Sequence, residues 1–486
     1  MELVALVKHD CPVCDQVLPA LDAAGVHVLS QSEPADTAAQ AVRLGLRAVP
    51  QPDEDLELSR RLDLEAVPAL VLLDGATEVA RVEGLHRARY ADIARQAGVT
   101  LALDGLPALR PGCASRTRDP EVAARLAART ARRTGRLRAR ELVVGELEDP
   151  FEALLHRGIT DGLPVVPPTP ERVVAMLDAT ARDAQDLVGV VPPYDGEATV
   201  EKVAINAVMA GCPPEAFPVV LAAVHAACRP EFALQGVLAT THPAGPTIVV
   251  SGPLAAQIGM NAAGNCLGQG NRANLTIGRT LGLVVRNVGG GRPGEEDRAA
   301  HGQPGKLASC FAERTEDSPF APLHVARGLD PGETGVTVMA TEAPRIVVDQ
   351  LAREPQALAR SLAGGLEAVA HVRQRLVWDA LLVVGPEHGR VFAQAGWSRE
   401  GLAQELFALT HAPAGSLVRG AGGIAEGLDP AWVSDPQQPV AKFASPERIV
   451  IAHAGGDAGR FSMVYGAWVG GEMGSVPVTE AVSPWR

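Results

Sequence analysis

Two cysteines follow an apolar run near the start of this 486-residue chain, and together they restrict the local fold. Residues 3–7 predict a buried strand, and residues 11–14 read Cys-Pro-Val-Cys. Apolar residues then recur at helical spacing, and proline is favoured in the first turn of a helix. Cys11 is therefore expected at a helix N-terminus, where unpaired amide groups and the positive end of the helix dipole stabilise a thiolate.

The rest of the first hundred residues adds further strand patterns. Residues 26–29 predict a short strand, and residues 70–73 predict a buried strand preceded by Val67-Pro68. Residues 78–82 follow an Asp-Gly turn and predict its hairpin partner. With its strand, Cys-Pro-Val-Cys at a helix start and Val-Pro before a hairpin, this region, residues 1–100, resembles the thioredoxin/glutaredoxin family.

The resemblance implies a redox-active dithiol, with Cys11 as the attacking thiol, Cys14 as the resolving thiol and Pro68 as a cis-proline beside them. A lone Cys-x-x-Cys also fits a structural metal knuckle or two buried thiols. The chain lacks the family's tryptophan before the first cysteine, and the long segment between the second strand and Pro68 suggests a remodelled middle. Pro19 predicts a kink or an early end of the first helix.

Charge and composition narrow the class of protein. Acidic residues number 57 against 44 basic ones, and the net charge of −13 argues against a nucleic-acid or anionic-membrane binder. No apolar run approaches the roughly 18 residues that span a bilayer. The first residues lack the basic region of a signal peptide, so we expect a cytoplasmic protein. Seven cysteines predict catalytic, redox or buried thiols rather than a disulfide scaffold.

Residues 101–150 change in character and predict a linker. Its alanine- and arginine-rich part, from residue 121 to residue 140, predicts an exposed helix. Cys113 is either a third redox thiol between domains or a bystander. Residues 151–486 predict an α/β catalytic domain of one body or two lobes, because helical stretches alternate with short apolar runs and no repeat period is visible.

The elements expected in this larger domain can be placed by residue number. Predicted helices cover residues 170–179, 199–210, 214–228, 271–287, 348–372 and 398–408, and apolar runs cover residues 237–241, 247–250, 381–384 and 449–452. Residues 158–169 and 318–325 resemble a bacterial family to which no chemistry is assigned, so this second resemblance predicts no function.

A segment rich in glycine and asparagine, residues 261–274, is the first candidate for chemistry in the large domain. Backbone amides near a helix start would converge there on an anion or a developing negative charge, and Cys266 would be a nucleophile. The residues expected to bind a small polar substrate are Asn261, Asn265, Gly268, Gly270, Asn271 and Arg272. A tight turn with a buried Cys266 explains the same pattern.

The second candidate combines Cys310 with His301 and His324, which could ligate a divalent metal such as zinc or form a nucleophile–base pair. Lys306 is one of only four lysines, so a compact amine would contact the substrate here as a charge or a proton donor. The spacing matches no metal signature, and a surface cluster of salt bridges explains it equally well.

The third candidate is Gly385-Pro386-Glu387-His388-Gly389, at the end of a predicted buried strand. Carboxyl ends of strands face the ligand crevice in open α/β sheets, so Glu387 and His388 are placed for acid–base catalysis. A solvated loop would carry the same residues. Glycine-rich residues 454–462 follow another strand and could cradle an anionic group.

These patterns together predict a thiol-dependent oxidoreductase. The Cys11–Cys14 dithiol would serve a larger domain in which Cys266 or Cys310 reacts with a small polar substrate. A thiol such as glutathione, or a thioredoxin reductase, would supply electrons. A divalent metal could bind in the large domain as a cofactor, and the chain could form a homo-oligomer. Two alternatives stay open: a metal-dependent lyase or hydrolase with an accessory dithiol domain, and a redox-controlled adaptor without turnover.

Overall fold

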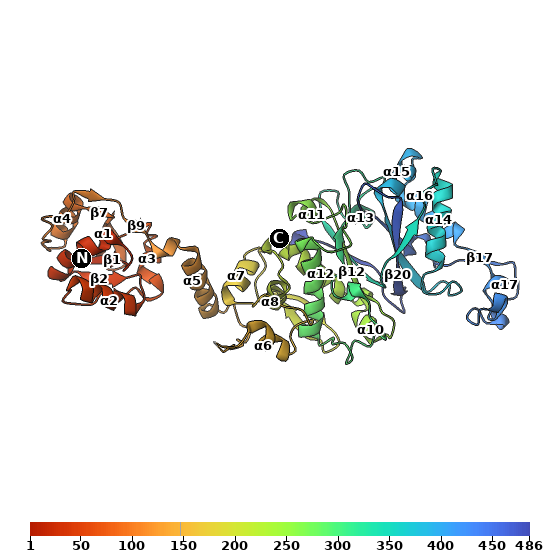
Figure 1. Ribbon diagram of the computed structural model, residues 1–486, viewed down its shortest axis with the longest axis horizontal. Helices are drawn as coiled ribbons and strands as arrows, with labels where there is room; N and C mark the ends of the chain where they lie inside the picture. Colours follow the sequence, from red (N-terminus) through yellow and green to blue (C-terminus); the bar gives the residue numbers. More distant parts are fainter. Residues whose placement is uncertain (146) are drawn as a thin grey trace. The chain divides into compact units, whose positions relative to one another are not determined.

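Helices and mixed sheets form two compact units in this computed structural model, Met1–Arg133 (unit 1) and Thr134–Arg486 (unit 2) (Figure 1). The structure describes residues 1–145 and 147–486. The combination of helices with parallel and antiparallel strands confirms the predicted α/β class. Unit 1 ends well beyond the predicted domain end at residue 100.

A five-stranded sheet in the order β3-β2-β1-β5-β6 organises unit 1. Its strands are β1 (Glu2–Val7), β2 (His27–Ser30), β3 (Gln51–Pro52), β5 (Ala69–Asp74) and β6 (Thr77–Glu83). β1 pairs parallel with β2 and antiparallel with β5, and β5 forms the predicted hairpin with β6. Helix α1 (Pro12–Ala23) begins after β1 and continues past Pro19, so the predicted early end does not occur. Leu18 and Leu21, on either side of Pro19, are buried in the core of the unit.

The segment between β2 and Pro68 contains its own short elements. They are α2 (Pro34–Leu44), β3, a 3₁₀ turn (Glu54–Leu56), α3 (Glu57–Arg61) and β4 (Ala66–Val67). The Val67–Pro68 peptide bond that follows β4 is cis. Helix α4 (Arg87–Gln96) closes this part of the chain.

Residues 109–118, which we call the strap, return to unit 1 rather than forming a linker. Strand β8 (Leu109–Arg110) pairs with β7 (Leu85–His86), and β9 (Cys113–Ala114) pairs antiparallel with β4. Helix α5 (Pro120–Arg133) follows the strap. Strands of two residues have no apolar period and bind through their backbone, which is why the sequence pattern predicted a linker here.

Unit 2 contains a repeated arrangement of three strands. In the first half, β12 (Gly245–Ser251) pairs parallel with β13 (Cys310–Ala312) and antiparallel with β14 (Gly335–Thr341). In the second half, β16 (Trp378–Val384) pairs parallel with β19 (Ile449–His453) and antiparallel with β20 (Phe461–Val469). Each central strand comes first and is followed by Gly-Pro and a helix, α11 (Pro253–Gln257) or α15 (Pro386–Gln394). Insertions of unequal length hide this repeat from a search for a fixed period.

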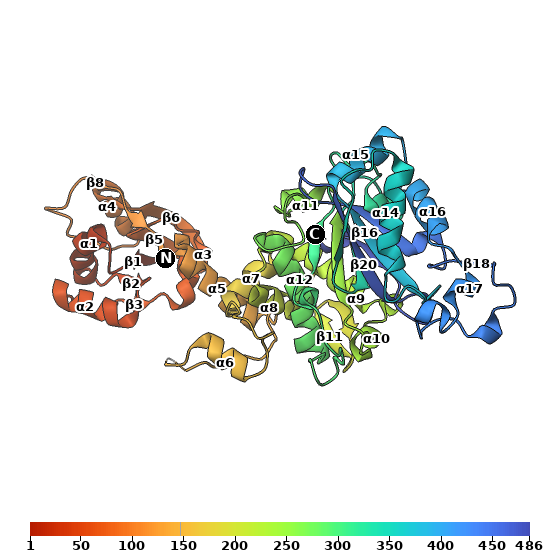
Figure 2. The ribbon, with the colours of Figure 1, turned by 45° about the vertical axis from the view of Figure 1, so that its right-hand side comes forward.

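The two halves join where β14 pairs with β20, and they share a core. Along β16, Leu382 packs under α14 (Pro355–Glu367) and α16 (Arg399–Leu409), whereas Leu381 faces a cluster that includes Val249 and Met339 of the first half. Figures 1 and 2 show α14 and α16 side by side next to β16 and β20. A strand that is buried on both faces has a continuous apolar run in its sequence, and residues 380–384 of β16 form such a run.

The remaining elements of unit 2 extend these halves. They are the helices α6 (Pro150–His156), α7 (Pro170–Leu177), α8 (Val200–Ala210), α9 (Phe217–Cys228), α10 (Leu234–Ala239), α12 (Arg272–Val284), α13 (Leu323–Ala326) and α17 (Ala414–Leu417), and the strands β10 (Leu187–Val191), β11 (Gly196–Thr199), β15 (Arg345–Val348), β17 (Ala412–Pro413), β18 (Pro439–Val440) and β21 (Val478–Ala481).

Two sequence predictions for unit 2 are corrected by these bounds. The apolar run at residues 237–241, read as a strand, lies in helix α10 and the bend after it, because a short apolar run does not distinguish a strand from a buried helix. The helix predicted over residues 348–372 is shorter, since α14 begins at Pro355.

No single helix in the described parts of the chain is long and apolar enough to cross a membrane. The helical segments Pro214–Cys228 and Pro230–Ala239 are together long and apolar enough to do so, but the chain bends by 69° between them.

Candidate functional site

Cys11 caps the N-terminus of α1. Its Sγ accepts a hydrogen bond from the Cys14 amide at 3.2 Å. The same sulfur lies 3.5 Å from the carbonyl oxygen of Val67, the residue before Pro68, and the protonated thiol donates to this oxygen. Cys11, Cys14 and Pro68 are therefore close together, as the sequence predicts. The Cys11 side chain is only 1% exposed.

The two thiols of this pair differ in acidity. Hydrogen bonding from Cys14, with smaller contributions from Cys113 and from the amides of Cys14 and Val13, lowers the pKa of Cys11 to about 5 despite burial. Burial and the neighbouring Cys11 raise the pKa of Cys14 well above its usual range. At neutral pH Cys11 is a thiolate, and Cys14 remains a thiol that donates to it.

The strap places a third thiol, that of Cys113, next to this pair. In the β4–β9 pair it lies directly opposite Val67. Burial raises the pKa of Cys113 to about 11, and its contact with the Cys11 sulfur acts in the same direction. Cys113 is half-buried, whereas Cys11 and Cys14 are fully buried, so it is the most accessible thiol of the three.

Charged and aromatic groups that the sequence did not single out surround the thiols. Asp10 lies 3.7 Å from both the Lys8 ammonium and the Arg116 guanidinium. Lys8 also lowers the pKa of Cys113 slightly against the larger effect of burial. Tyr90 is buried near the pair, and its hydroxyl has no hydrogen-bond partner among the described residues. Burial, followed by the nearby Cys14 and Cys11, raises the pKa of Tyr90.

The two thiols predicted to react in unit 2 are buried. Cys266 lies in the core shared by the two halves, and burial raises its pKa to about 11, although two backbone amides act against this. Burial also raises the pKa of Cys310, on β13. Desolvation of the thiolate therefore outweighs the loop amides that were expected to activate Cys266.

The polar side chains predicted to hold a substrate bind their own chain instead. Asn271 caps α12 by accepting from the Asn274 amide at 2.9 Å. Three further hydrogen bonds run from a side chain to a backbone oxygen. Asn261 Nδ2 donates to Gly264 O at 2.9 Å, Asn265 Nδ2 to Gln269 O at 2.7 Å, and Arg272 Nε to Gly211 O at 2.8 Å. Gly268 and Gly270 lie in the turn between them. These hydrogen bonds stabilise the loop.

Three glycine-rich loops that the sequence treated separately meet in unit 2. The Gly455 amide donates to Ala262 O at 2.9 Å. A Cβ at Gly456 would lie 3.1 Å from Gly264 Cα, and one at Gly455 would lie 3.2 Å from Pro386 Cδ. The glycines therefore allow close packing of backbone from the ends of two strands.

Glu387 and His388 are both held by protein groups. Glu387 accepts from the Gly459 amide at 2.9 Å and lies 3.3 Å from the Arg460 guanidinium. His388 is fully buried, its Nδ1 lies 2.8 Å from Ser462 Oγ, and burial lowers its pKa. The second ring nitrogen, Nε2, lies 3.2 Å from the Asp349 carbonyl oxygen, so both nitrogens of His388 have partners within the protein.

The predicted metal ligands do not come together. His324 is buried against Ser251 Oγ at 2.8 Å from its Nδ1, whereas His301 is exposed and Cys310 lies within β13. Among the described residues no group of three or more His, Cys, Asp or Glu side chains could hold a metal ion. The predicted Cys310–His301–His324 site is therefore wrong, because neighbours in sequence are separated by the path of the chain.

Lys306 differs from these cases, since it lines a cavity together with His301. Its ammonium lies 2.7 Å from Asp297 Oδ1.

Comparisons of the chain with protein-family models, with curated proteins and with solved structures returned no match.

Proposed function

We propose that unit 1 is a thioredoxin-like module and that the protein is a thiol–disulfide oxidoreductase, with Cys11 as the nucleophile. The observation that supports this most directly is the contrast between the two thiols of one helical turn. Cys11 accepts from the Cys14 amide and has a pKa of about 5, whereas the pKa of Cys14 is raised. This division of acidity suits an attacking thiolate and a resolving thiol.

The reaction has two exchange steps. The Cys11 thiolate attacks one sulfur of a substrate disulfide, which forms a mixed disulfide and releases the other substrate sulfur as a thiolate that takes up a proton. Cys14 then loses its proton and attacks the Cys11 sulfur, which releases the second substrate thiol. The substrate disulfide is reduced to two thiols, and the protein is left with a Cys11–Cys14 disulfide.

An external thiol must then restore the dithiol. Glutathione or a thioredoxin reductase would supply two electrons to the Cys11–Cys14 disulfide, which suits a reducing compartment such as the cytoplasm. In this exchange the sulfur atoms themselves carry the two electrons. In this proposal unit 2 binds a small ligand, and its cysteines do not exchange, because burial raises the pKa of both Cys266 and Cys310.

We further propose that Cys113 is a second exchange partner of Cys11. Because β9 holds it opposite Val67, its sulfur is next to the Cys11 sulfur in the folded protein. Attack by Cys113 on a Cys11–Cys14 disulfide would form a Cys11–Cys113 disulfide and release Cys14 as the free thiol. This step moves a disulfide without any external oxidant or reductant.

Turnover of the full-length protein tests the proposal. Insulin is the disulfide substrate and dithiothreitol the electron donor, and we expect Cys11→Ser to lose nearly all activity. Cys228→Ser is the matched control, because Cys228 is a thiol of α9 whose pKa burial raises to about 12. Cys266→Ser and Cys310→Ser should also retain the wild-type rate.

Undiminished turnover in Cys11→Ser would reject the proposal. Absence of turnover in the wild-type protein, combined with a large redox-dependent change in association with another protein, would favour the adaptor alternative instead.

A further inference from the structure

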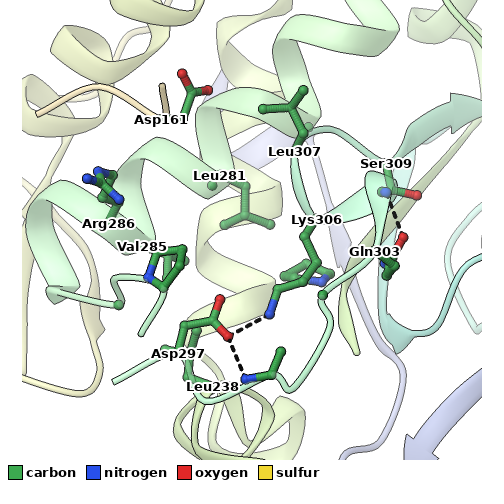
Figure 3. Close-up of a pocket in the computed structure, with 18 of the residues that line it drawn as sticks. Asp161, Leu238, Leu281, Val285, Arg286, Asp297, Gln303, Lys306, Leu307 and Ser309 are labelled. Carbon is green, nitrogen blue, oxygen red and sulfur yellow. Dashed lines mark hydrogen bonds and ion pairs between the residues drawn. The ribbon is translucent and has the colours of Figure 1, made fainter. Parts of the chain in front are cut away.

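A cavity of about 640 Å³ in unit 2 lies outside everything assigned to the thiols. Its walls come from α10, from α12 and the π-helical turn Val285–Gly289 that extends it, and from the loop that leads to β13 (Figure 3). This volume is within the range of sites for small molecules. π-Helical turns also occur frequently at functional sites.

Each carboxylate on the cavity wall already has a cation of its own. Asp297 lies 2.7 Å from the Lys306 ammonium, which turns toward it in Figure 3. Asp161 accepts two hydrogen bonds from Arg279 at 2.7 and 2.8 Å. Burial opposes the ionised form of Asp161, but Arg279 still holds its pKa below the usual range.

Arg286 is the cation on the wall that these carboxylates do not neutralise. It lies in the π-helical turn, and its Nε is buried without a hydrogen-bond partner among the described residues. A buried guanidinium donor without a partner is costly, and the guanidinium plane matches a carboxylate through two parallel hydrogen bonds. The uncompensated positive charge of Arg286 therefore favours binding of an anion at this wall, although the net charge of the whole protein is −13.

Apolar side chains form much of the remaining wall. They include Leu234 and Leu238 of α10, Leu281 of α12 and Val285 of the π-helical turn. Binding is favoured when an apolar part of a ligand covers this surface, because the surface is then removed from water.

We propose that this cavity binds a small organic carboxylate with an apolar body, with Arg286 binding the carboxylate and the leucine-lined wall enclosing the body. The site is independent of the thiol chemistry of unit 1. It makes unit 2 a ligand-binding body, and it predicts that affinity depends on both the charge and the apolar part of the ligand.

Binding of octanoate to the reduced full-length protein, measured by isothermal titration calorimetry, tests this proposal. Octanamide is the neutral control ligand of nearly the same shape. We expect octanoate to bind at least tenfold more tightly than octanamide, and Arg286→Met to remove that difference. Arg298→Met is the matched control variant, because Arg298 is exposed on the loop that leads to β13 and does not line the cavity.

A second variant fills the cavity without changing charge. A Cβ at Gly282 of α12 would lie 3.8 Å from Lys306 O and 3.9 Å from Leu307 O, which is ordinary contact. Gly282→Leu should therefore keep the helix and weaken octanoate binding at least tenfold. Equal affinity of the wild-type protein for octanoate and octanamide, absence of octanoate binding, or unchanged binding in a folded Arg286→Met protein would each overturn the proposal.

Discussion

Cys113 lies directly opposite Val67 across the β4–β9 pair, and the Val67 carbonyl is 3.5 Å from the Cys11 sulfur. Cys113 also interacts with the Cys11 sulfur, so the strap places a third thiol beside a residue that is only 1% exposed. The strap therefore places Cys113 beside Cys11, which is the position that the proposed exchange requires.

The first prediction concerns this partner. With Cys14→Ser, mild oxidation by diamide should convert most of the protein to a Cys11–Cys113 disulfide, because Cys113 is the remaining thiol beside Cys11. Mass spectrometry of peptides prepared without reductant identifies the linked pair. With Cys113→Ser, the same treatment should yield Cys11–Cys14 alone. Finding no Cys11–Cys113 link in Cys14→Ser would assign Cys113 the bystander role.

The second prediction concerns access to Cys11. A Cβ at Gly112 would lie 2.7 Å from Val67 O, closer than side chains tolerate, so Gly112→Ala should loosen the strap. Overpacking costs typically 1–3 kcal/mol, which raises the population of locally opened molecules between about fivefold and about 150-fold. Alkylation of Cys11 by iodoacetamide, followed by mass spectrometry, should accelerate by a similar factor.

Gly364→Ala is the control for that experiment, because no atom lies within 4 Å of a Cβ at this position in α14. It should leave the alkylation rate of Cys11 unchanged. An equal rate in Gly112→Ala and the wild-type protein would show that the strap does not limit access.

The third prediction concerns the pH dependence of the Cys11 thiolate. Hydrogen bonding from Cys14 lowers the pKa of Cys11 to about 5, so its thiolate should be fully formed at neutral pH and lost as the pH falls through 5. The ultraviolet absorbance of the thiolate in the reduced protein follows this transition. It should be absent in Cys11→Ser and present in Cys228→Ser. A midpoint near the ordinary thiol value of 9.0 would contradict the proposed activation.

Sequence reasoning located the dithiol because its determinants are local. The apolar run of β1, the proline after Cys11 and the helical spacing of α1 lie within about twenty residues, and each has a known effect on backbone geometry. The strands β12, β16 and β19 were found for the same reason, since burial on both faces produces a continuous apolar run.

Contacts between distant segments were missed. Cys113 reaches Cys11 through a backbone pairing of two residues, which has no side-chain pattern. Arg286 is one of 40 arginines, and only the folded chain shows that its Nε has no hydrogen-bond partner among the residues that the structure describes. Cys266 was predicted to be activated because nearby amides can be read from a sequence, whereas the burial that raises its pKa cannot.

The fourth prediction concerns the ion pair between Arg399 and Glu313, which joins the two halves of unit 2. Arg399 of α16 lies 2.9 Å from Glu313, and the two side chains are 8% and 0% exposed. Glu313 also accepts from Ser251 Oγ and the Leu323 amide, both at 2.6 Å, which orients its carboxylate. Removal of one partner from a buried pair leaves the other charge without compensation and costs about 3–5 kcal/mol.

Arg399→Met should therefore lower the free energy of unfolding of unit 2 by about 3–5 kcal/mol, measured by urea denaturation. The control is Arg419→Met, which removes an arginine from an exposed pair with Asp429, side chains 55% and 37% exposed. Exposed pairs contribute about 0–1 kcal/mol, so this variant should unfold near the wild-type midpoint. A similar small change in both variants would mean that Glu313 is stabilised by Ser251 and the Leu323 amide alone, and that the two halves are held together by their shared apolar core.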